Sequence, residues 1–254
     1  MPMPHTMQPI GIIHSCFKEK FGIPRQAGLA PSARATLELL PPYNRPEALT
    51  GLDGFSHVWL LFIFHGNQTP QNKQRKNWKP TVRPPRLGGN KRLGVFATRS
   101  TYRPNSVGLS AVELLGYGQE SGRLVLQLGG VDLLDETPVI DIKPYLPYSD
   151  SIPTATGGFA PSPPAETMTI EFTPSAEAVC QEIEQTIYPN FRRLVSQILK
   201  DDPRPAYYGT KPQKNRFGIK LLDFDLQWQV EENKGNEGNE GNKIVVLDVK
   251  KITA

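Results

Sequence analysis

Cysteine is scarce in this sequence, since only Cys16 and Cys180 occur among 254 residues. They lie far apart and form no Cys-x-x-Cys pair, which argues against a disulfide scaffold and favours a reducing compartment. Long hydrophobic runs are also missing, because the longest, residues 58–64, has seven residues, whereas a membrane span needs roughly 20. The first residues, MPMPHTMQPIG, do not resemble a signal peptide. We therefore expect a cytoplasmic protein that does not enter a membrane.

The sequence also lacks the glycine-rich motifs of several large enzyme classes. No GxGxxG follows an expected strand, and neither GxxxxGK(S/T) nor GxSxG occurs. Their absence argues against dinucleotide-binding, P-loop and α/β-hydrolase folds. The nearest glycine pattern, residues 116–122, fits a hairpin turn. The histidines, His5, His14, His57 and His65, have no metal-ligand spacing, so we expect no metal site.

Acidic residues are absent between Asp53 and Glu113. This stretch of 59 residues contains ten basic side chains, whereas the rest of the chain has 19 basic and 25 acidic ones. Such a concentration of positive charge favours an anionic partner carrying phosphate, although a solvated basic loop is the alternative. The ten basic residues are Lys73, Arg75, Lys76, Lys79, Arg83, Arg86, Lys91, Arg92, Arg99 and Arg103.

Proline and glycine are abundant, with 25 and 22 residues, and both disfavour long helices. Short apolar or alternating segments lie between the prolines and glycines. In one of them, Ala35, Leu37 and Leu39 should share a buried face. Residues 46–52 predict a helical turn. Strands at this spacing without intervening helices predict a β-barrel or sandwich. The expected strands are residues 10–14, 33–40, 57–65, 93–98, 107–117 and 123–128.

The second part of the chain has a different pattern. Residues 151–166 are rich in Ser, Thr, Pro and Gly and predict a linker. After it we expect a strand at 167–172, helices at 175–187 and 190–200, and a terminal hairpin of 217–230 with 243–252. The prediction is a mainly β protein with an N-terminal β domain (8–150), a linker and a small α+β C-terminal domain (167–254). The inward helix positions would be Val179, Ile183, Ile187, Phe191, Leu194, Val195 and Ile198.

One motif combines arginines with an aromatic ring. In LGVFATRSTYRPNSVGL, residues 93–109, Arg99 and Arg103 flank Tyr102. Guanidinium groups bind phosphate and an aromatic side chain stacks on bases, so this motif is suited to a nucleotide. The alternative is a polar turn that joins two strands.

A second motif gathers acids among prolines. In VDLLDETPVIDIKPYLPYSD, residues 131–150, the acids include Asp132, Asp135, Glu136 and Asp141. Neighbouring carboxylates can hold Mg²⁺, act as a base or accept hydrogen bonds from ribose. The alternative is that they are solvated and cap turns.

The ordered motifs FGIPRQ, GFSHVWLLFIFH, ATRSTYRPNSVGLSAVELL, DLLDETPVIDIKPYLPYSD and DPRPAYYG resemble the TsaA-like family, over nearly the whole chain. This is a family of bacterial tRNA methyltransferases that methylate N6 of threonylcarbamoyladenosine beside the anticodon. The resemblance implies a single-sheeted β-barrel that binds S-adenosylmethionine and a small α/β C-terminal domain. It also implies a homodimer with the cofactor site near its interface.

The resemblance further implies four cofactor-contacting segments. The family often has glycine where this chain has Glu136, so a backbone contact should survive there while the local charge differs. The implied cofactor-binding residues are Pro24, Arg25 and Gln26 in the first segment, His65 and Gly66 in the second, Arg99 and Leu109 in the third, and Asp135, Glu136, Thr137 and Pro138 in the fourth.

For the reaction, the acceptor nitrogen must lose a proton, and a general base is expected. The candidates are Asp202 or Tyr207 of DPRPAY, near Arg204, which two prolines hold in place, or Asp135. The basic stretch would hold the anticodon stem-loop through its phosphates, with loop bases stacked on Tyr102 or Trp78. The expected RNA-binding residues are Lys73, Arg75, Lys76, Lys79, Arg83, Arg86, Lys91, Arg92, Tyr102 and Arg103.

Two other functions remain open on the sequence alone. The first is a barrel that binds RNA without catalysing methyl transfer. The second is a metal-dependent phosphodiesterase built on Asp132, Asp135 and Asp141. The second is the weaker of the two, because prolines crowd these acids and no paired histidine accompanies them.

Overall fold

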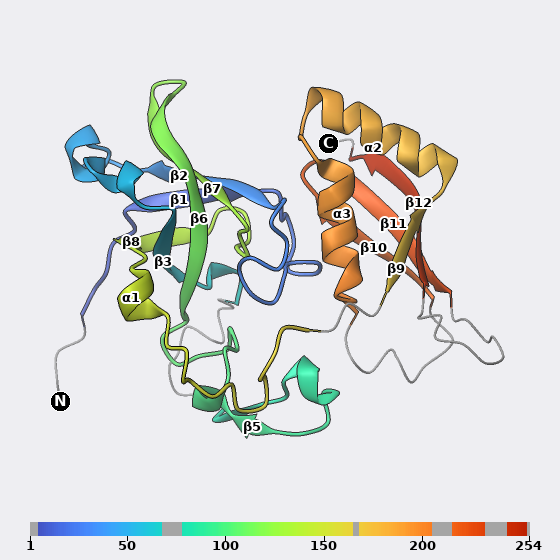
Figure 1. Ribbon diagram of the computed structural model, residues 1–254, viewed down its shortest axis with the longest axis horizontal. Helices are drawn as coiled ribbons and strands as arrows, with labels where there is room; N and C mark the ends of the chain where they lie inside the picture. Colours follow the sequence, from blue (N-terminus) through green and yellow to red (C-terminus); the bar gives the residue numbers. More distant parts are fainter. Residues whose placement is uncertain (1–4, 68–77, 165–167, 205–214, 232–242, 253–254) are drawn as a thin grey trace.

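Figure 1 shows the computed structural model of the chain, which describes residues 5–67, 78–164, 168–204, 215–231 and 243–252. The molecule has two lobes. A six-stranded sheet forms one lobe, and a four-stranded sheet with two helices forms the other. The two-stranded sheet of β4 (Thr81–Val82) and β5 (Leu93–Gly94) lies below the six-stranded sheet in Figure 1, as does the segment that follows α1 (Pro147–Asp150).

The first lobe is a single antiparallel sheet whose two ends meet. Its strand order is β1-β2-β7-β6-β3-β8, and β8 pairs back with β1, which closes the sheet into a barrel. Closure leaves no free strand edge in this sheet. The strands are β1 (Gly11–Ser15), β2 (Arg34–Leu39), β3 (His57–Ile63), β6 (Val107–Glu120), β7 (Arg123–Gly129) and β8 (Pro138–Pro144).

Alternation of apolar and polar residues produces the barrel core. Ala35, Leu37 and Leu39 of β2 are buried, as predicted, while their neighbours are more exposed. In β3, every second side chain from Val58 to Phe62 is buried in the same way. Inward side chains of this kind fill a small barrel completely. The mainly β class predicted from the sequence is confirmed.

In the first part of the chain, the structure differs from the sequence prediction at two strands and refines the predicted helical turn. The strand predicted at 93–98 is wrong, because only Leu93–Gly94 pairs as β5 and Val95–Ala97 form a 3₁₀ turn. No strand was predicted at Pro138–Pro144, yet β8 is the strand that closes the barrel. The helical turn predicted at 46–52 is present as two 3₁₀ turns, Pro46–Leu49 and Leu52–Gly54.

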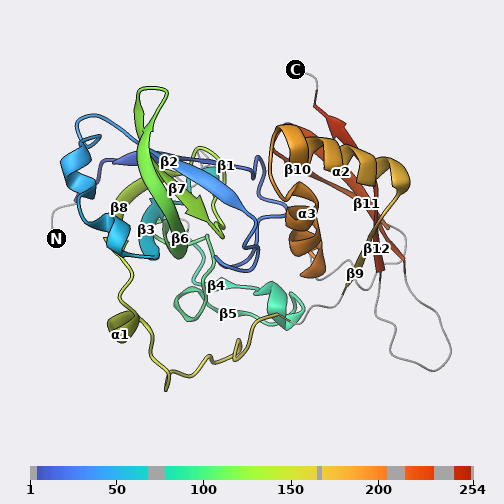
Figure 2. The same ribbon diagram turned by 45° about the horizontal axis from the view of Figure 1, so that its top comes forward.

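The second lobe is an α/β unit with strand order β10-β11-β12-β9. The strands β10, β11 and β12 are antiparallel to one another, and β9 lies parallel to β12. Helices α2 and α3 pack on one face of this sheet (Figure 2). None of the helices in the described ranges has the length and apolar character needed to cross a bilayer. The elements are β9 (Thr169–Phe172), α2 (Pro174–Thr186), α3 (Phe191–Lys200), β10 (Arg216–Leu221), β11 (Phe224–Glu231) and β12 (Lys243–Lys251).

The predicted inward positions hold for α3 and fail in part for α2. Phe191, Leu194, Val195 and Ile198 are all buried. In α2 the buried residues are Ala176, Cys180 and Ile183, whereas Ile187 lies beyond the end of the helix and is exposed. The segment predicted as one strand at 217–230 is instead a hairpin of β10 and β11 that turns at Leu222, where φ is +53°.

The two lobes are joined by backbone hydrogen bonds as well as by apolar packing. Phe17, which follows β1, forms an isolated antiparallel bridge with Leu221 at the end of β10. The amide of Leu222 donates to the carbonyl of Cys16 at 2.8 Å. Residues just after the first barrel strand therefore continue into the C-terminal sheet, and the lobes share one hydrophobic core cluster.

Tyr188, between α2 and α3, makes two hydrogen bonds from the second lobe to the barrel. Its hydroxyl accepts a hydrogen bond from the amide of Arg34 at 2.6 Å and donates one to the carbonyl of Ser32 at 3.0 Å. Burial raises the pKa of Tyr188 far above its ordinary value. The hydroxyl therefore stays protonated and keeps its donor at any physiological pH.

Cys16 and Cys180 are both free and buried, so the prediction that they form no disulfide is confirmed. Burial raises the pKa of each thiol to about 12. A protonated, buried thiol is a poor nucleophile. Both cysteines therefore serve as small core residues.

Candidate functional site

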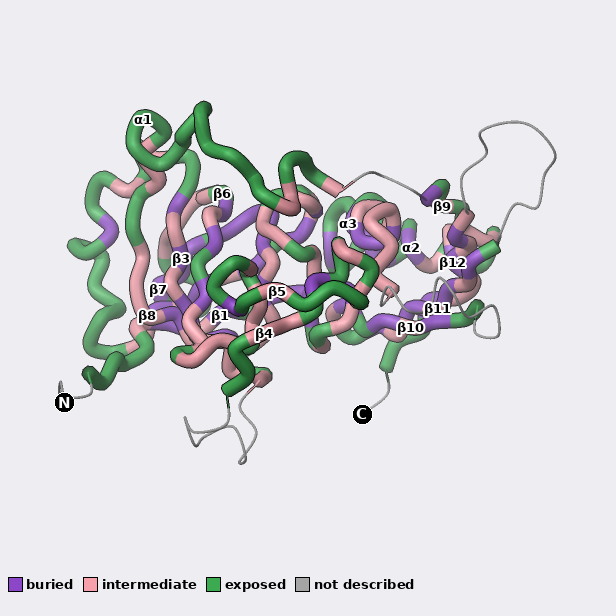
Figure 3. The backbone as a smooth tube through the Cα atoms, turned by 90° about the horizontal axis from the view of Figure 1, so that it is seen from below, coloured by how far each residue is buried: buried purple, intermediate pink, exposed green. Residues whose placement is uncertain are grey.

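A large groove lies between the barrel and the end of α3. Its volume is about 1840 Å³, and residues within 25–29, 78–106, 157–164 and 201–204 line it together with Asn67. These stretches are distant in sequence, and Figure 2 shows β4 and β5 below the barrel close to α3. Seen from below in Figure 3, the strip around β4 and β5 is mostly exposed or half-buried. The groove is large enough to hold a ligand of nucleotide size or more.

Arg99 and Gln26, two of the predicted cofactor-binding residues, meet in the groove. Nη1 of Arg99 donates to Oε1 of Gln26, and Arg25 lines the groove beside them. Arg99 of the third predicted segment therefore lies beside Gln26 of the first. Pro24 does not line the groove but lines a smaller cavity of about 100 Å³, together with Arg25 and with Ile198 of α3.

Asp132 lies behind this pair and was predicted only as one of several clustered acids. Burial raises the pKa of its carboxyl group, while hydrogen bonds from the Ser110 hydroxyl and the Ala27 amide and the charge of Arg99 act in the opposite direction. Its Oδ1 atom is buried and has no hydrogen-bond partner within the described ranges. A buried carboxylate oxygen left without a donor is unfavourable, and such groups are concentrated at functional sites.

The free energy of unfolding should depend on pH through Asp132. A carboxyl whose pKa is higher in the folded than in the unfolded chain makes the folded state bind more protons, so stability falls as pH rises above the unfolded value of about 3.9. Asp132→Asn cannot ionise and should remove this loss. Its free energy of unfolding should exceed that of the wild type at neutral pH, by a margin that begins to grow as the pH rises above about 4.

Urea unfolding measured across this pH range tests the prediction. Asp53→Asn is a control, because this carboxylate is exposed. A lower stability of Asp132→Asn than of the wild type at neutral pH would show that the ionised carboxylate stabilises the fold.

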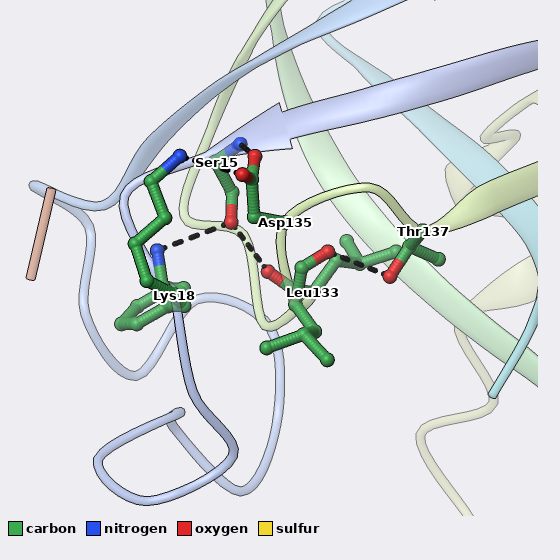
Figure 4. Close-up of polar contacts among 7 residues, drawn as sticks. Ser15, Lys18, Leu133, Asp135 and Thr137 are labelled. Carbon is green, nitrogen blue, oxygen red and sulfur yellow. Dashed lines mark hydrogen bonds and ion pairs between the residues drawn. The ribbon is translucent and has the colours of Figure 1, made fainter. Parts of the chain in front are cut away.

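Asp135 is held in place by its neighbours (Figure 4). Its Oδ1 accepts the amide of Ser15 at 2.8 Å and its Oδ2 pairs with Nζ of Lys18 at 2.5 Å. The hydroxyl of Ser15 donates to the carbonyl of Leu133 at 2.8 Å. Both carboxylate oxygens are therefore engaged in fixing the 133–137 loop against the end of β1, and Asp135 does not line the groove.

His65 and Gly66 lie beside the same loop. The Nδ1 atom of His65 is 3.4 Å from the hydroxyl of Thr137, which itself donates to the carbonyl of Leu134 at 2.6 Å. At Gly66 a Cβ atom would lie 3.0 Å from Leu134 Cδ2, so this position has little room for a side chain. The second and fourth predicted segments are therefore adjacent. Pro138 begins β8 next to Ile12.

Glu136 has a backbone conformation that favours glycine. It is exposed, and its φ of +62° places it in the left-handed region. An L-residue with a Cβ atom is strained there, whereas glycine is not. This agrees with the glycine that the TsaA-like family often has at this position.

Leu109 is not brought to the other predicted cofactor-binding residues. It sits on the outer face of β6, and 54% of its surface is exposed, while Ser110 points into the barrel. Leu109 does not line the groove.

Asp202 and Arg204 line the groove at the end of α3 and bind each other. Nε of Arg204 is 2.7 Å from Oδ1 of Asp202, and Nη2 is 2.8 Å from Oδ2. The Arg204 side chain is only 12% exposed, and its guanidinium lies 5.9 Å from the centre of the Phe217 ring. Such a bidentate pair is rigid and occupies both carboxylate oxygens. Tyr207, the third predicted catalytic residue, lies outside the described residues.

The basic stretch forms one wall of the groove. Lys79, Arg83, Arg86 and Arg92 line it, while Lys91 is exposed but does not. Arg86 donates to the carbonyl of Ser162 at 2.5 Å and Arg92 to the hydroxyl of Thr81 at 3.2 Å. These acceptors are neutral, so the positive charge is not cancelled. Three further predicted residues, Lys73, Arg75 and Lys76, lie outside the described residues.

Phe96 was missed by the sequence analysis. It lines the groove with 72% of its surface exposed, next to Trp78 at 44% and near Tyr102 at 60%. The wrong prediction of a strand at 93–98 made Phe96 one more apolar strand residue. The structure instead has a 3₁₀ turn at Val95–Ala97, which buries Val95 and turns Phe96 outward. The apolar pattern of the sequence does not distinguish this turn from a strand.

The acids proposed for a phosphodiesterase do not converge. Asp135 pairs with Lys18, Asp141 pairs with Lys143 at 3.5 Å, and the charge of Arg99 acts on Asp132, whose Oδ1 atom is buried. Within the described ranges, no three His, Cys, Asp or Glu side chains form a group able to hold a metal ion. The geometry therefore offers nothing in favour of this function.

Comparison with known domain families gives two consecutive matches. Residues 12–151 match the tRNA-methyltransferase O N-terminal domain, and residues 165–251 match the TrmO C-terminal domain. Together the two matches span most of the chain, and the gap between them falls on the segment after α1.

Curated relatives are similar over nearly the same length. The Escherichia coli (strain K12) protein named tRNA (adenine(37)-N6)-methyltransferase is 47% identical over 223 residues, which is 88% of this chain and 92% of that protein. A Pseudomonas aeruginosa protein named "Putative S-adenosylmethionine-dependent methyltransferase RcsF" is 51% identical over 226 residues, covering 89% and 93%. A crystal structure of TrmO from Pseudomonas aeruginosa matches the fold with a TM-score of 0.75 at 42% identity, covering 98% of this chain and 99% of that one.

Proposed function

Because this chain belongs to the tRNA-methyltransferase O family, we propose that it is an S-adenosylmethionine-dependent methyltransferase acting on N6 of adenosine 37 of tRNA. The acceptor would be threonylcarbamoyladenosine, as the TsaA-like motifs imply. The observation that carries the proposal most directly is the hydrogen bond between Arg99 and Gln26 in a groove whose wall is basic, with the charge of Asp132 acting on Arg99. A candidate cofactor site beside a candidate RNA surface is the arrangement that this reaction needs.

The residues of this site fit S-adenosylmethionine. The cofactor carries a cationic sulfonium, an ammonium, a carboxylate and a purine. Arg99 offers a guanidinium to the carboxylate, and Gln26 offers an amide to polar groups. Beside them, the unpaired buried oxygen of Asp132 gives the site a negative charge that a cationic ligand compensates. His65, Gly66, Glu136, Thr137 and Pro138 would complete the site from the neighbouring loop, which Asp135 fixes.

When bound, the cofactor supplies an electrophilic methyl group: N6 attacks the methyl carbon, the carbon–sulfur bond breaks in line, and N6 releases a proton. The chain contributes mainly alignment, for which effective molarities of about 10⁵ M or more are known. Asp202 and Tyr207 are our candidates for accepting the proton, with Arg204 holding Asp202 in one orientation. Asp135 is the weaker candidate, because it does not line the groove, whereas Asp202 does.

We further propose that the basic wall holds the anticodon stem-loop through its phosphates and that the protein acts as a cytoplasmic homodimer. The first point is supported by the four basic residues that line the groove, Lys79, Arg83, Arg86 and Arg92. The hydrogen bonds of Arg86 and Arg92 go to neutral acceptors, so their charges remain available to phosphates. Leu109 supports the second, since this exposed apolar residue, implied at the cofactor, lies away from the groove of its own chain. We take 8–150 as the cofactor-binding domain, 151–166 as a linker and 167–254 as the C-terminal domain.

Arg99→Ala should weaken S-adenosylmethionine binding by about 10- to 100-fold, since a hydrogen bond to a charged group contributes about 1.5–3 kcal/mol. Titration calorimetry measures the change. Arg45→Ala is the matched control, because Arg45 is exposed and does not line the groove. Equal affinities of Arg99→Ala and the wild type would remove Arg99 from the cofactor site.

Methyl transfer itself is tested by incubating the protein with S-adenosylmethionine and undermethylated tRNA, then analysing the nucleosides by mass spectrometry. The proposal requires one additional methyl group on threonylcarbamoyladenosine. Binding of tRNA without any transfer, under conditions in which the cofactor binds, would instead favour the non-catalytic RNA-binding barrel.

A further inference from the structure

The wall of the groove carries aromatic side chains that the protein's own packing does not bury. Phe96 is 72% exposed and Trp78 is 44% exposed, whereas Phe17, Phe191 and Trp228 are fully buried in the core. Exposed large aromatic side chains that lie together are characteristic of binding surfaces. Both rings line the groove described above.

The two rings form a defined pair and are held by a rigid turn. Their centroids are 6.0 Å apart and their planes are inclined by 37°. Next to Phe96, Val95 is buried and its amide donates to the carbonyl of Pro80 at 2.9 Å, which ties the turn to the strip that follows Trp78. The turn therefore directs Phe96 into the groove before any ligand binds.

Arg103 fixes the other side of Phe96. Its guanidinium lies 5.9 Å from the centre of the Phe96 ring and donates to the carbonyl of Thr98 at 2.8 Å. A guanidinium held by a neutral carbonyl retains its charge, so the ring has a cation at its side. Such a combination of ring and cation suits a nucleobase that is attached to a phosphate.

The charges around the pair indicate which kind of partner covers it. Arg83, Arg86, Arg92 and Arg99 line the same groove. Asp202, an acid in the lining, is paired with Arg204. An apolar peptide or a lipid tail would gain nothing from these guanidinium groups, whereas RNA presents phosphates to them and unpaired bases to the rings.

We propose that Phe96 and Trp78 form a stacking platform for an unpaired base of the RNA substrate, so that the groove recognises a single-stranded loop and not a duplex. The inference rests on the proposed function, because it assumes that the groove receives RNA. The inference explains how the groove would select a loop over a duplex. The arginines bind the phosphates of the RNA backbone, and the platform accepts only a base that is not paired in a helix.

The test compares Phe96→Ala with Phe96→Tyr, which keeps the ring. Two RNAs are used, an anticodon stem-loop and a fully paired duplex of the same length and charge. We expect Phe96→Ala to bind the stem-loop about 5- to 100-fold more weakly, as the loss of one stacked base predicts. The affinity of Phe96→Ala for the duplex should stay within twofold of that of the wild type. The slope of log K against log salt should be unchanged, because no phosphate contact is removed. Phe96→Tyr should restore stem-loop binding.

Calorimetry with S-adenosylmethionine and ultracentrifugation accompany the RNA measurements. Unchanged cofactor affinity in Phe96→Ala supports a defect confined to RNA. If Phe96→Ala binds the stem-loop as tightly as the wild type does, the platform is overturned. It is also overturned if the wild type is a dimer and Phe96→Ala is a monomer, because Phe96 would then lie against a second copy of the chain. If the wild type binds no stem-loop at all, the proposed function fails and not only the platform.

Discussion

Reversing three arginines of the groove wall to glutamate is expected to lower tRNA affinity by about 10³-fold or more at low salt. The variant is Arg83→Glu, Arg86→Glu and Arg92→Glu, and all three residues line the groove. Each phosphate contact releases counterions, so the loss of three contacts and the added repulsion both act against binding. The slope of log K against log salt should become shallower by about three units. Fluorescence anisotropy of labelled tRNA over a salt series measures both quantities.

The control has the same change in charge on other surfaces. Arg45→Glu, Arg193→Glu and Lys251→Glu are exposed positions outside the groove. This variant should keep most of its tRNA affinity, and both variants should keep their affinity for S-adenosylmethionine. If the groove variant binds tRNA as tightly as the control variant does, the basic stretch is a solvated loop and the RNA lies elsewhere.

Tyr188→Phe is expected to destabilise the protein by about 2–4 kcal/mol. The substitution removes one hydroxyl and leaves two backbone groups, the amide of Arg34 and the carbonyl of Ser32, without their partner in a place that water reaches poorly. An unsatisfied buried donor or acceptor costs about 1–3 kcal/mol. The loss falls on the junction between the two lobes. Equilibrium unfolding in urea measures it.

Tyr148→Phe is the matched control, because Tyr148 lies on α1 and is 87% exposed. It should leave the free energy of unfolding within about 0.5 kcal/mol of the wild type. Equal stabilities of Tyr188→Phe and Tyr148→Phe would mean that water replaces the Tyr188 hydroxyl. In that case apolar packing alone holds the lobes together.

The sequence predicted the elements in which hydrophobic pattern and position agree. Alternation in β2 and β3 and the four inward positions of α3 needed no further information. The prediction failed at β8, where three acids or prolines interrupt the pattern and only the pairing with β1 and β3 makes a strand. It failed again at 93–98, where an apolar run looks like a strand and the chain instead makes a 3₁₀ turn.

The site was predictable to the extent that it depends on residue type. The basic stretch followed from its charge, and the family motifs named Arg99 and Gln26 without giving the hydrogen bond between them. The burial of the Asp132 Oδ1 atom could not be predicted, because whether a carboxylate oxygen is solvated depends on the side chains around it, here Ser110 and Arg99. The exposure of Phe96 was hidden for the same reason, since the sequence contains the ring but not the direction in which the turn points it.

The strand order of the α/β unit has a consequence for how the chain folds during synthesis. β12 is the last described strand, yet it lies between β11 and β9. On the ribosome, β9 therefore has no partner strand until residues 243–251 emerge, whereas every strand of the barrel is complete at Pro144. Domains fold as units as they are synthesised. The barrel can close first, and α2 and α3 must wait for the final strand before they have a complete sheet to cover.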